Sequence, residues 1–398
     1  MREAAIVSTA RTGIGKAYRG AFNVTEAPVL AGHVMNAAVE RAEIDPARID
    51  DVFWGVGNQW GTQGGNAGRM AVFAAGLPQS VPAFTLDRKC GSGLNALALA
   101  ARSIIAGDID VALSGGMESI SLTVTRDAPR FANQSVLERE PHAYMAMIET
   151  AEIVAERYGI SRAAQDEYAA MSQQRAAAGL ANGAFVEEIV AVTVEKAIFD
   201  KEGNRTGSET VTVTQDEGIR AGTTAEALAG LRTVFEDGQV IKQGQHITAG
   251  NASQLSDGAA AQIVMDRATA EAEGREILGI YRGFQAAGCG PDEMGIGPVF
   301  AIPKLLARAG LKVEDIGLWE LNEAFASQCL YCRDHLGIDP EKYNVNGGAI
   351  AVGHPFGMTG ARLVGHALIE ARKRGVQYAV VSMCTAGGMG AAGLFEIV

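Results

Sequence analysis

The chain has 398 residues, 47% of them hydrophobic, which is enough apolar material to bury one large core or two moderate ones. Its 34 Lys and Arg residues stand against 46 Asp and Glu residues, and the net charge of −12 disfavours binding to nucleic acid or to an anionic membrane surface. No apolar run is long enough to predict a membrane span, and the first residues lack the apolar centre of a signal peptide. We therefore expect a globular, cytoplasmic protein of more than one domain.

The five cysteines predict free thiols in a reducing compartment, because their number is odd and no secretion signal precedes them. Cys329 and Cys332 have the spacing of half a metal site. No second pair or histidine cluster completes four ligands, so we expect two thiols on a helix face and no metal site.

Glycine is frequent, at 49 residues, and aromatic residues make up only 6%, which favours an α/β protein with tight junctions between strands and helices. Short β-branched runs alternate with alanine-rich runs of helical period. In chain order they predict a strand at 4–8, a helix at 29–42, a strand at 51–54, a helix at 93–106 and a strand at 111–114. This order is typical of stacked βαβ units.

The sequence also repeats itself at a nearly constant offset. Residues 41–44, Arg-Ala-Glu-Ile, match residues 308–311, Arg-Ala-Gly-Leu, at an offset of 267. Residues 107–114 match residues 375–382 at an offset of 268. Two widely separated matches at almost one offset indicate two copies of one α/β unit.

We assign the two copies to residues 1–120 and 275–398. Between them, residues 121–246 are rich in polar residues and alanine, which predicts an inserted subdomain. The segment 247–274 contains the strand-like run 259–265, and we expect this run to return to the sheet of the first copy.

Cys90 lies in a glycine-rich turn that leads into the predicted helix 93–106. A thiol at a helix N-terminus faces unpaired N–H groups and the positive end of the helix dipole, so we expect its pKa to fall below the usual value of about 8.5. Such a cysteine is a nucleophile near neutral pH. The alternative is a small buried thiol that fills the junction. The glycines on both sides of Ser92 indicate that another group approaches the backbone closely, which favours a reactive cysteine.

Two further loop residues are candidates for acid/base or oxyanion chemistry. His354 lies in a loop rich in glycine and proline, where it could be a general base or could only cap backbone groups. Asn322 follows the predicted strand 318–321, and it could hold a water, donate to an oxyanion or cap the next helix. The roles proposed for Asn322 can coexist.

Cys384 directly follows the apolar run 378–383 and opens a glycine-rich loop. Open α/β sheets bind ligands at this end of their strands. The corresponding position of the first copy, 268 residues earlier, is Gly116. The second copy has therefore gained a functional group where the first has none.

Together these loops resemble the thiolase family, and the resemblance covers essentially the whole chain. The matching signatures are Cys-Gly-Ser-Gly at 90–93, Asn-Glu-Ala-Phe at 322–325, Asn-Gly-Gly-Ala-Ile-Ala-x-Gly-His-Pro at 346–355 and Cys-x-x-Gly-Gly-x-Gly at 384–390. The resemblance implies a duplicated α/β fold, with two five-stranded mixed-sheet halves stacked in layers. It also implies an inserted loop domain that binds coenzyme A, and a homodimer or homotetramer.

The family transfers an acyl group between coenzyme A thioesters and forms or cleaves a 3-ketoacyl-CoA, with acetyl-CoA and free CoA as partners and no tightly bound cofactor. By resemblance, Cys90 is the acylated nucleophile, and His354 activates it. Cys384 is implied to be the acid/base at the α-carbon, and Asn322 to hold a water that donates with His354 to the thioester oxygen. The backbone N–H groups of Cys90 and Ala386 are implied to form a second oxyanion hole.

The resemblance also implies contacts to the substrate. Ser253 falls at the position that contacts the pantetheine arm of coenzyme A. Arg220 falls where a basic residue meets its adenosine phosphate end. Met294 falls at a position beside the substrate, and Met147 and Phe325 are implied to contact the substrate or coenzyme A.

Two other functions fit parts of this sequence. A β-ketoacyl synthase shares the duplicated fold and the cysteine nucleophile, but generally lacks an acid/base cysteine near the end of the chain, so Cys384 argues against it. A non-catalytic acyl-CoA or lipid carrier of the same fold should have lost at least one of the four chemical residues, and all four are present. The direction of the reaction and the length of the acyl chain stay open.

Overall fold

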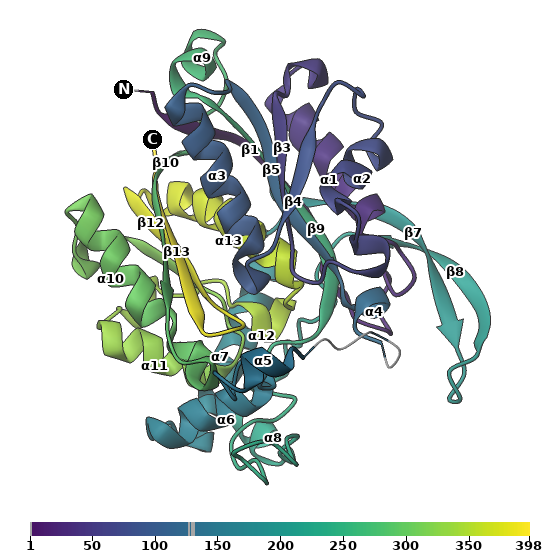
Figure 1. The fold of residues 1–398 in the computed structure, drawn as a ribbon, viewed down its shortest axis with the longest axis vertical. Coiled ribbons are helices and arrows are strands. Elements are labelled where there is room, and N and C mark those ends of the chain that lie inside the picture. Colours follow the sequence, from purple (N-terminus) through teal and green to yellow (C-terminus); the bar gives the residue numbers. More distant parts are fainter. Residues whose placement is uncertain (1, 126–127, 129–131) are drawn as a thin grey trace.

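The structure is a computed structural model that describes residues 2–125, 128 and 132–398. Its helices and strands form alternating layers (Figure 1). Two helices, α3 and α13, lie between two groups of strands, and further helices cover the outer face of each group. None of the helices in these described ranges is long and apolar enough to cross a membrane.

The first group of strands has the order β4-β3-β5-β9-β1. Its strands are β1 (Ala4–Thr12), β3 (Asp51–Val56), β4 (Ala83–Leu86), β5 (Val111–Ser119) and β9 (Ser256–Asp266). β3 pairs in parallel with β4 and with β5, whereas β9 runs antiparallel to both β5 and β1. The prediction that the run 259–265 returns to the first sheet is therefore confirmed.

The second group has the order β11-β12-β13-β10. Its strands are β10 (Gly279–Gly288), β11 (Leu318–Leu321), β12 (Tyr378–Thr385) and β13 (Met389–Glu396). An isolated parallel bridge between Trp319 and Tyr343 stands at its edge, where the first group has β4. The two groups join through β1 and β10, which pair antiparallel at Ala5 with Ile280 and at Ile6 with Gly279.

One layer of helices lies between the two groups of strands, and one further layer covers the outer face of each group. The helices are α1 (Ala27–Ala42), α2 (Ala67–Ala74), α3 (Ser92–Ala106), α9 (Arg267–Ala272), α10 (Pro298–Ala309), α11 (Ala326–Leu336), α12 (Ala349–Val352) and α13 (Phe356–Arg374). In Figure 1, α1 and α2 lie on the right of the first group, and α10 and α11 lie on the left of the second. α3 and α13 contact both groups, and most of the residues in each of these two helices are buried.

The duplication predicted from the sequence is confirmed by the bounds of these elements. α1 ends at Ala42 and α10 at Ala309, and β3 begins at Asp51 and β11 at Leu318, so both pairs are 267 residues apart. The last residues of α3 and α13 are 268 apart. The same two offsets thus relate the structural elements and the sequence matches.

Glycines allow the two central helices to approach closely. A Cβ atom added to Gly93 of α3 would lie 2.7 Å from the carbonyl oxygen of Gly357 on α13. One added to Gly360 would collide with the backbone nitrogen of Leu94. Backbone can approach backbone here only because side chains are absent. The N-terminal ends of the two helices therefore meet.

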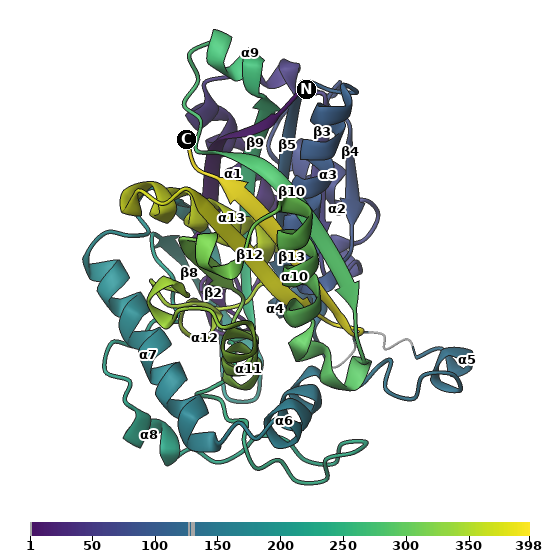
Figure 2. The same cartoon turned by 90° about the vertical axis from the view of Figure 1, so that its left-hand side faces the viewer.

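The segment between the two halves forms helices, most of which lie in the lower part of the molecule in Figure 2, and a hairpin. Its elements are α4 (Ile120–Thr123), α5 (Gln134–Leu137), α6 (Met147–Arg157), α7 (Arg162–Ala181), β6 (Ile189–Val190), β7 (Val192–Phe199), β8 (Arg205–Val213) and α8 (Ala225–Ala229). β7 and β8 pair only with each other and project from the body on the right of Figure 1. The short strand β2 (Gly15–Lys16) adds to β9.

A buried arginine anchors this segment to the first sheet. Arg11, on β1, is 2% exposed and pairs with Glu188 at 2.7 Å and with Asp216 at 2.6 Å. Glu188 also contacts Nδ1 of His366 at 3.0 Å. Burial alone would raise the pKa of Glu188, but Arg11 and His366 outweigh it and lower this pKa to about 2.

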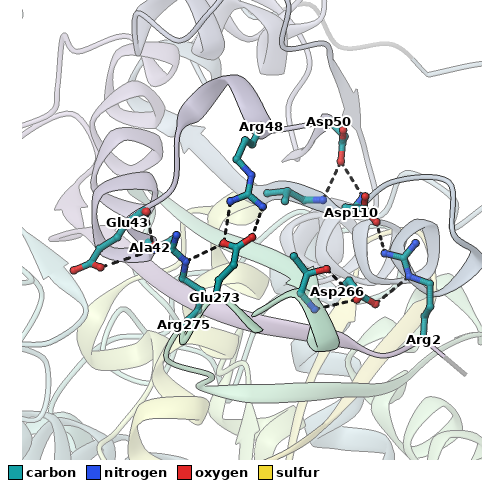
Figure 3. Close-up of polar contacts among 11 residues, drawn as sticks. Arg2, Ala42, Glu43, Arg48, Asp50, Asp110, Asp266, Glu273 and Arg275 are labelled. Carbon is teal, nitrogen blue, oxygen red and sulfur yellow. Dashed lines mark hydrogen bonds and ion pairs between the residues drawn. The ribbon is translucent and has the colours of Figure 1, made fainter. Parts of the chain in front are cut away.

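A second set of charges lies at the surface, at the end of the sheet where β5 begins (Figure 3). Arg48 forms a bidentate pair with Glu273 at 2.7 and 2.9 Å. Arg275 donates to the carbonyl oxygen of Glu43 at 2.7 Å, which ties the end of α1 to the segment after α9. These groups are partly open to solvent, so each pair stabilises the fold only slightly.

We predict that Arg11→Met lowers the free energy of unfolding by about 3 to 5 kcal/mol, because it leaves Glu188 and Asp216 buried without their cation. The matched variant Arg48→Met should lower it by less than about 1 kcal/mol. Urea unfolding of both variants at neutral pH measures the difference. Equal losses in the two variants would contradict the anchoring role of Arg11.

Candidate active site

Cys90 lies in a tight turn that the sequence holds in place. The turn is a 3-10 helix at Lys89–Gly91, directly before α3, and Lys89 adopts a left-handed backbone with φ of 47°. Asp87 accepts the backbone N–H of Lys89 at 2.6 Å. The Ser92 hydroxyl accepts the N–H of Arg88 at 2.8 Å and donates to the carbonyl oxygen of Lys89 at 2.7 Å. The Cys90 thiol is thereby fixed at the N-terminus of α3.

His354 faces this thiol from the loop before α13. Its Nε2 lies 3.1 Å from Sγ of Cys90, and its Nδ1 lies 2.7 Å from the hydroxyl of Thr359. The single proton of that hydroxyl is donated to the carbonyl oxygen of Pro355 at 2.8 Å, so Thr359 can only accept from His354. Nδ1 therefore carries the imidazole proton, and the lone pair of Nε2 points at the thiol. Both ring nitrogens bind side chains, so His354 does not cap the backbone through its ring.

Burial keeps this pair uncharged. It raises the pKa of Cys90 to about 12, despite the opposing effect of nearby N–H groups and Lys89, and Glu118 raises it further. Burial, together with the charge of Arg362, lowers the pKa of His354 to about 3. The prediction of a lowered Cys90 pKa is thus wrong for the resting protein. The helix N-terminus does favour the thiolate, but the loss of water around the sulfur outweighs it.

Asn322 follows β11 and brings a side-chain amide to the same histidine. Its Nδ2 lies 3.3 Å from Nε2 of His354. Its Oδ1 is buried and has no hydrogen-bond partner among the residues that the structure describes. α11 begins only at Ala326, with Phe325 at the N-cap position, so the interpretation of Asn322 as a helix cap is wrong. Its side chain is directed to the site instead.

The turn between β12 and β13 completes the surroundings of Cys90. The backbone N–H groups of Cys90 itself and of Ala386 both lie against the thiol sulfur and lower its pKa. Gly388, with φ of 79°, allows the turn to close, because a Cβ there would collide with the carbonyl oxygen of Cys289. The two N–H groups named from the resemblance therefore both act on the nucleophile.

Cys384 is the residue before the last of β12, a strand that contacts the turn that carries Cys90, and it is completely buried. Burial raises the pKa of its thiol well above the usual value. It belongs to a small apolar cluster that includes three residues expected beside the substrate, Met147, Met294 and Phe325. The structure thus brings these three side chains together around Cys384.

Gly116 explains why the first copy has no counterpart of Cys384. A Cβ atom at Gly116 would collide with the carbonyl oxygen of Gly357, in the first turn of α13. The first copy therefore uses this position to seat the helix that follows His354. The second copy uses it for a thiol.

Ser253 lies in an extended segment that runs between the Asn322 and His354 loops. Its N–H donates to the carbonyl oxygen of Ala324 at 2.9 Å. The next residue, Gln254, accepts the backbone N–H of His354 at 3.1 Å. Arg220 is exposed, in the loop between β8 and α8, and this loop contacts Gln254 through the carbonyl oxygen of Gly218 at 3.4 Å. The structure therefore places Ser253 in the site and Arg220 on the adjoining loop.

Cys329 and Cys332 are both buried on α11, as the prediction of helix-face thiols required. Over residues 2–125, 128 and 132–398, no group of three or more His, Cys, Asp or Glu side chains could hold a metal ion.

Two residues that organise the site were missed from the sequence. One is Thr359, whose hydroxyl is hidden within an ordinary helical run. The other is Glu118, a fully buried carboxylate that accepts the N–H groups of Gly57 at 2.8 Å and Gly357 at 3.0 Å, and the side chain of Gln63 at 2.6 Å. It joins the loop after β3 to the first turn of α13. Glu118 is the residue before the last of β5, and a carboxylate near the end of an otherwise uncharged strand was the signal that could have identified it.

Comparison with known proteins gives matches over nearly all of the chain. Residues 4–268 match the family described as thiolase, N-terminal domain, and residues 275–397 match the thiolase C-terminal domain. A 3-ketoacyl-CoA thiolase of Bacillus subtilis is 46% identical over 398 residues, covering 100% of both chains.

Two solved structures share the fold. The acetyl-CoA acetyltransferase of Bacillus anthracis superposes with a TM-score of 0.88 at 35% identity, covering 100% of this chain and 99% of that one. The dimeric peroxisomal thiolase of Saccharomyces cerevisiae has a TM-score of 0.88 at 38% identity, covering 100% and 97%. The layered fold expected from the resemblance is confirmed.

We predict that alkylation of Cys90 by iodoacetamide is nearly independent of pH. The neutral thiol and imidazole hold as many protons as the thiolate and imidazolium, so internal proton transfer forms the nucleophile without help from hydroxide. The rate should change by less than about threefold between about pH 6 and about pH 9, whereas an ordinary thiol gains almost tenfold per unit below its pKa of about 8.5. Mass spectrometry of the Cys90 peptide over time measures it.

The control for this prediction is His354→Asn, which removes the internal proton acceptor. Its alkylation should be slower and should rise with pH throughout the same range, because burial still raises the pKa of Cys90. A parent protein with the pH dependence of an ordinary thiol would contradict the neutral pair.

A second prediction concerns the tautomer of His354. Thr359→Val keeps the shape of the side chain but removes the acceptor for Nδ1–H, and should slow alkylation of Cys90 by about 10 to 100-fold, the range for one lost hydrogen bond to a group that becomes charged. Thr359→Ser keeps the hydroxyl and should stay within about threefold of the parent. Equal rates for the Val and Ser variants would rule out this role.

Proposed function

The chain belongs to the thiolase family, and on that premise we propose how its residues divide the work of acyl transfer. The protein is an acyltransferase that acts on coenzyme A thioesters and cleaves or forms a 3-ketoacyl-CoA. The observation that supports the division of roles is the 3.1 Å contact between Cys90 and His354, at a turn that contacts β12, the strand of Cys384.

In the direction of cleavage, Cys90 attacks the 3-keto carbon while its proton passes to Nε2 of His354. The bond between C2 and C3 then breaks, the acyl group stays on Cys90, and the carbanion at C2 takes the proton of Cys384. Acetyl-CoA leaves, and Cys384 is left as a thiolate. A high pKa in the resting state suits Cys384 to this step, because its thiol must still be protonated when the carbanion at C2 forms.

In the second half, the Cys384 thiolate takes the proton of an incoming coenzyme A thiol. The coenzyme A sulfur attacks the acyl group on Cys90, and the released Cys90 thiolate recovers its proton from His354. Condensation is the same sequence in reverse. The complete cycle of two steps thus returns every proton, as two-step covalent catalysis requires.

Two sets of donors stabilise the oxyanions that form in these steps. The backbone N–H groups of Cys90 and Ala386 serve the oxyanion on the acyl group bound to Cys90. His354, with a water held by Asn322, serves the thioester oxygen of the enolate. The buried, unpartnered Oδ1 of Asn322 is the atom suited to hold that water. Each donor of this kind is worth about 3 kcal/mol of barrier.

Coenzyme A binds, in this proposal, along the segment that carries Ser253 and the loop that carries Arg220. Residues 121–246 form the loop domain for the coenzyme, between a first half at 1–120 completed by 247–274 and a second half at 275–398. Support comes from Ser253, which hydrogen bonds to the loop that carries Asn322. The apolar residues around Cys384 would contact the acyl group.

We also propose a homodimer that works in the cytoplasm without a tightly bound cofactor, with coenzyme A as substrate and product. The dimeric structure of the Saccharomyces cerevisiae relative supports the assembly, and a homotetramer is the alternative. The five free cysteines support a reducing compartment.

The proposal predicts that the two reactive cysteines are separable. Cys384→Ala should still take an acetyl group onto Cys90 from acetyl-CoA, but its turnover of acetoacetyl-CoA should fall by about 10² to 10⁴, the usual range for losing a general acid/base. Cys90→Ala should lose both activities. Intact-protein mass spectrometry measures loading, and the loss of acetoacetyl-CoA absorbance measures turnover.

Cys289→Ala is the matched control, because Cys289 is a free thiol of the same protein that is not part of the proposed chemistry. Its acetyl loading on Cys90 and its turnover of acetoacetyl-CoA should equal those of the parent protein. If Cys384→Ala cleaved acetoacetyl-CoA at the parent rate, the β-ketoacyl synthase and carrier functions would have to be reconsidered.

A further inference from the structure

The thiol of Cys384 is buried among apolar side chains, where a thiolate is difficult to form. Its surroundings include Ala151, Ile247, Met294 and Phe325, and the residue has no exposed surface. Both directions of the proposed reaction nevertheless pass through the Cys384 thiolate. A buried anion requires a hydrogen-bond donor close by.

Gln328 is the polar side chain that meets this sulfur. It lies on α11, is fully buried, and its terminal amide is 3.5 Å from Sγ of Cys384. Among the described residues, no other side chain forms a hydrogen bond to Cys384. Gly295 makes room for it, because a Cβ atom there would lie 2.8 Å from Cβ of Gln328.

The partners of the amide decide which of its ends faces Cys384. In the orientation that satisfies both ends, Nε2 donates to the carbonyl oxygen of Asn322 at 3.1 Å, and Oε1 accepts the N–H of Cys329 at 2.9 Å. The NH₂ group then occupies the position next to Cys384. It has two protons, so one binds the carbonyl oxygen and the second is left for the sulfur.

We propose that Gln328 is a positioning residue that stabilises the thiolate of Cys384 by donating its second N–H proton to the sulfur. This inference rests on the proposed function of Cys384. In condensation, the thiolate takes a proton from the methyl group of acetyl-CoA, so a C–H bond breaks, an S–H bond forms and the electron pair stays on the enolate. Gln328 loses no proton. Its hydrogen bond only makes the thiolate easier to form.

The same amide connects the two parts of the site. Its first proton holds the backbone oxygen of Asn322, whose side chain faces His354. Gln328 therefore fixes Cys384 relative to the donors that receive the enolate oxygen. A polar network of this kind contributes most when every member has a partner.

The test follows exchange of the acetyl-CoA methyl protons in D₂O, which needs the base but no completed carbon–carbon bond. Gln328→Met has a similar shape without the donor, and exchange should slow by about 10 to 100-fold. Its pH profile should also move to higher pH, because the thiolate is harder to form. Acetyl loading of Cys90 should fall less than exchange does, because the leaving coenzyme A sulfur can also take its proton from water, whereas methyl exchange requires the Cys384 thiolate. Gln328→Glu places an acceptor against the sulfur and should slow exchange further.

Gln165→Met is the matched control. Gln165 is also fully buried and donates to a carbonyl oxygen, that of Ile160 at 3.0 Å, on α7 rather than at Cys384. Its exchange rate and pH profile should equal those of the parent. Urea unfolding of each variant shows whether any loss follows from stability.

Three outcomes separate this inference from the proposed function. Exchange at the parent rate in Gln328→Met, or an equal loss of exchange and acetyl loading without a change in the pH profile, overturns the role of Gln328. Undiminished exchange in Cys384→Ala overturns the role of Cys384 itself, and with it this inference. Loss of exchange in Cys384→Ala together with the shifted profile in Gln328→Met supports both.

Discussion

The contact between α3 and α13 is the constraint on which the active site depends. Gly93 and Gly360 allow the two backbones to touch, and each helix begins at the loop that carries one member of the reactive pair. The helices come from different copies of the duplicated unit. Cys90 and His354, 264 residues apart in sequence, are therefore set by helix packing at a distance that proton transfer requires. A methyl group at either glycine would separate them.

Burial determines the protonation states of Cys90 and His354 before the substrate reacts. A thiol and an imidazole that stay neutral avoid the free-energy cost of an ion pair in an enclosed site, and the charge appears only when the substrate accepts it. The same holds for Cys384, whose proton is retained until a carbanion needs it. These side chains can be uncharged before the reaction and still react, because the hydrogen-bond donors for each transient anion are already in place.

The sequence predicted the parts of this structure that leave a local pattern. The duplication, the succession of strands and helices along the first copy and the loops of Cys90, His354 and Cys384 were all visible, because glycine-rich turns after apolar runs mark the ends of strands. Thr359 and Gln328 were not, since they lie in helical runs where polar residues are ordinary, and Gln328 meets its partner 56 residues away. The pKa of Cys90 was predicted with the wrong sign, because a sequence shows a helix terminus but not how much water surrounds it.

The position of β9 has a consequence for biosynthesis. This strand lies between β1 and β5 in the first sheet, yet it follows the whole inserted segment in the chain. During translation, the facing edges of β1 and β5 therefore stay unpaired until the ribosome has passed residue 266. Pairings of such long sequence separation form slowly, and open strand edges associate with other chains. The nascent chain is thus most exposed to aggregation while its loop domain is being made, and chaperone binding would matter most in that interval.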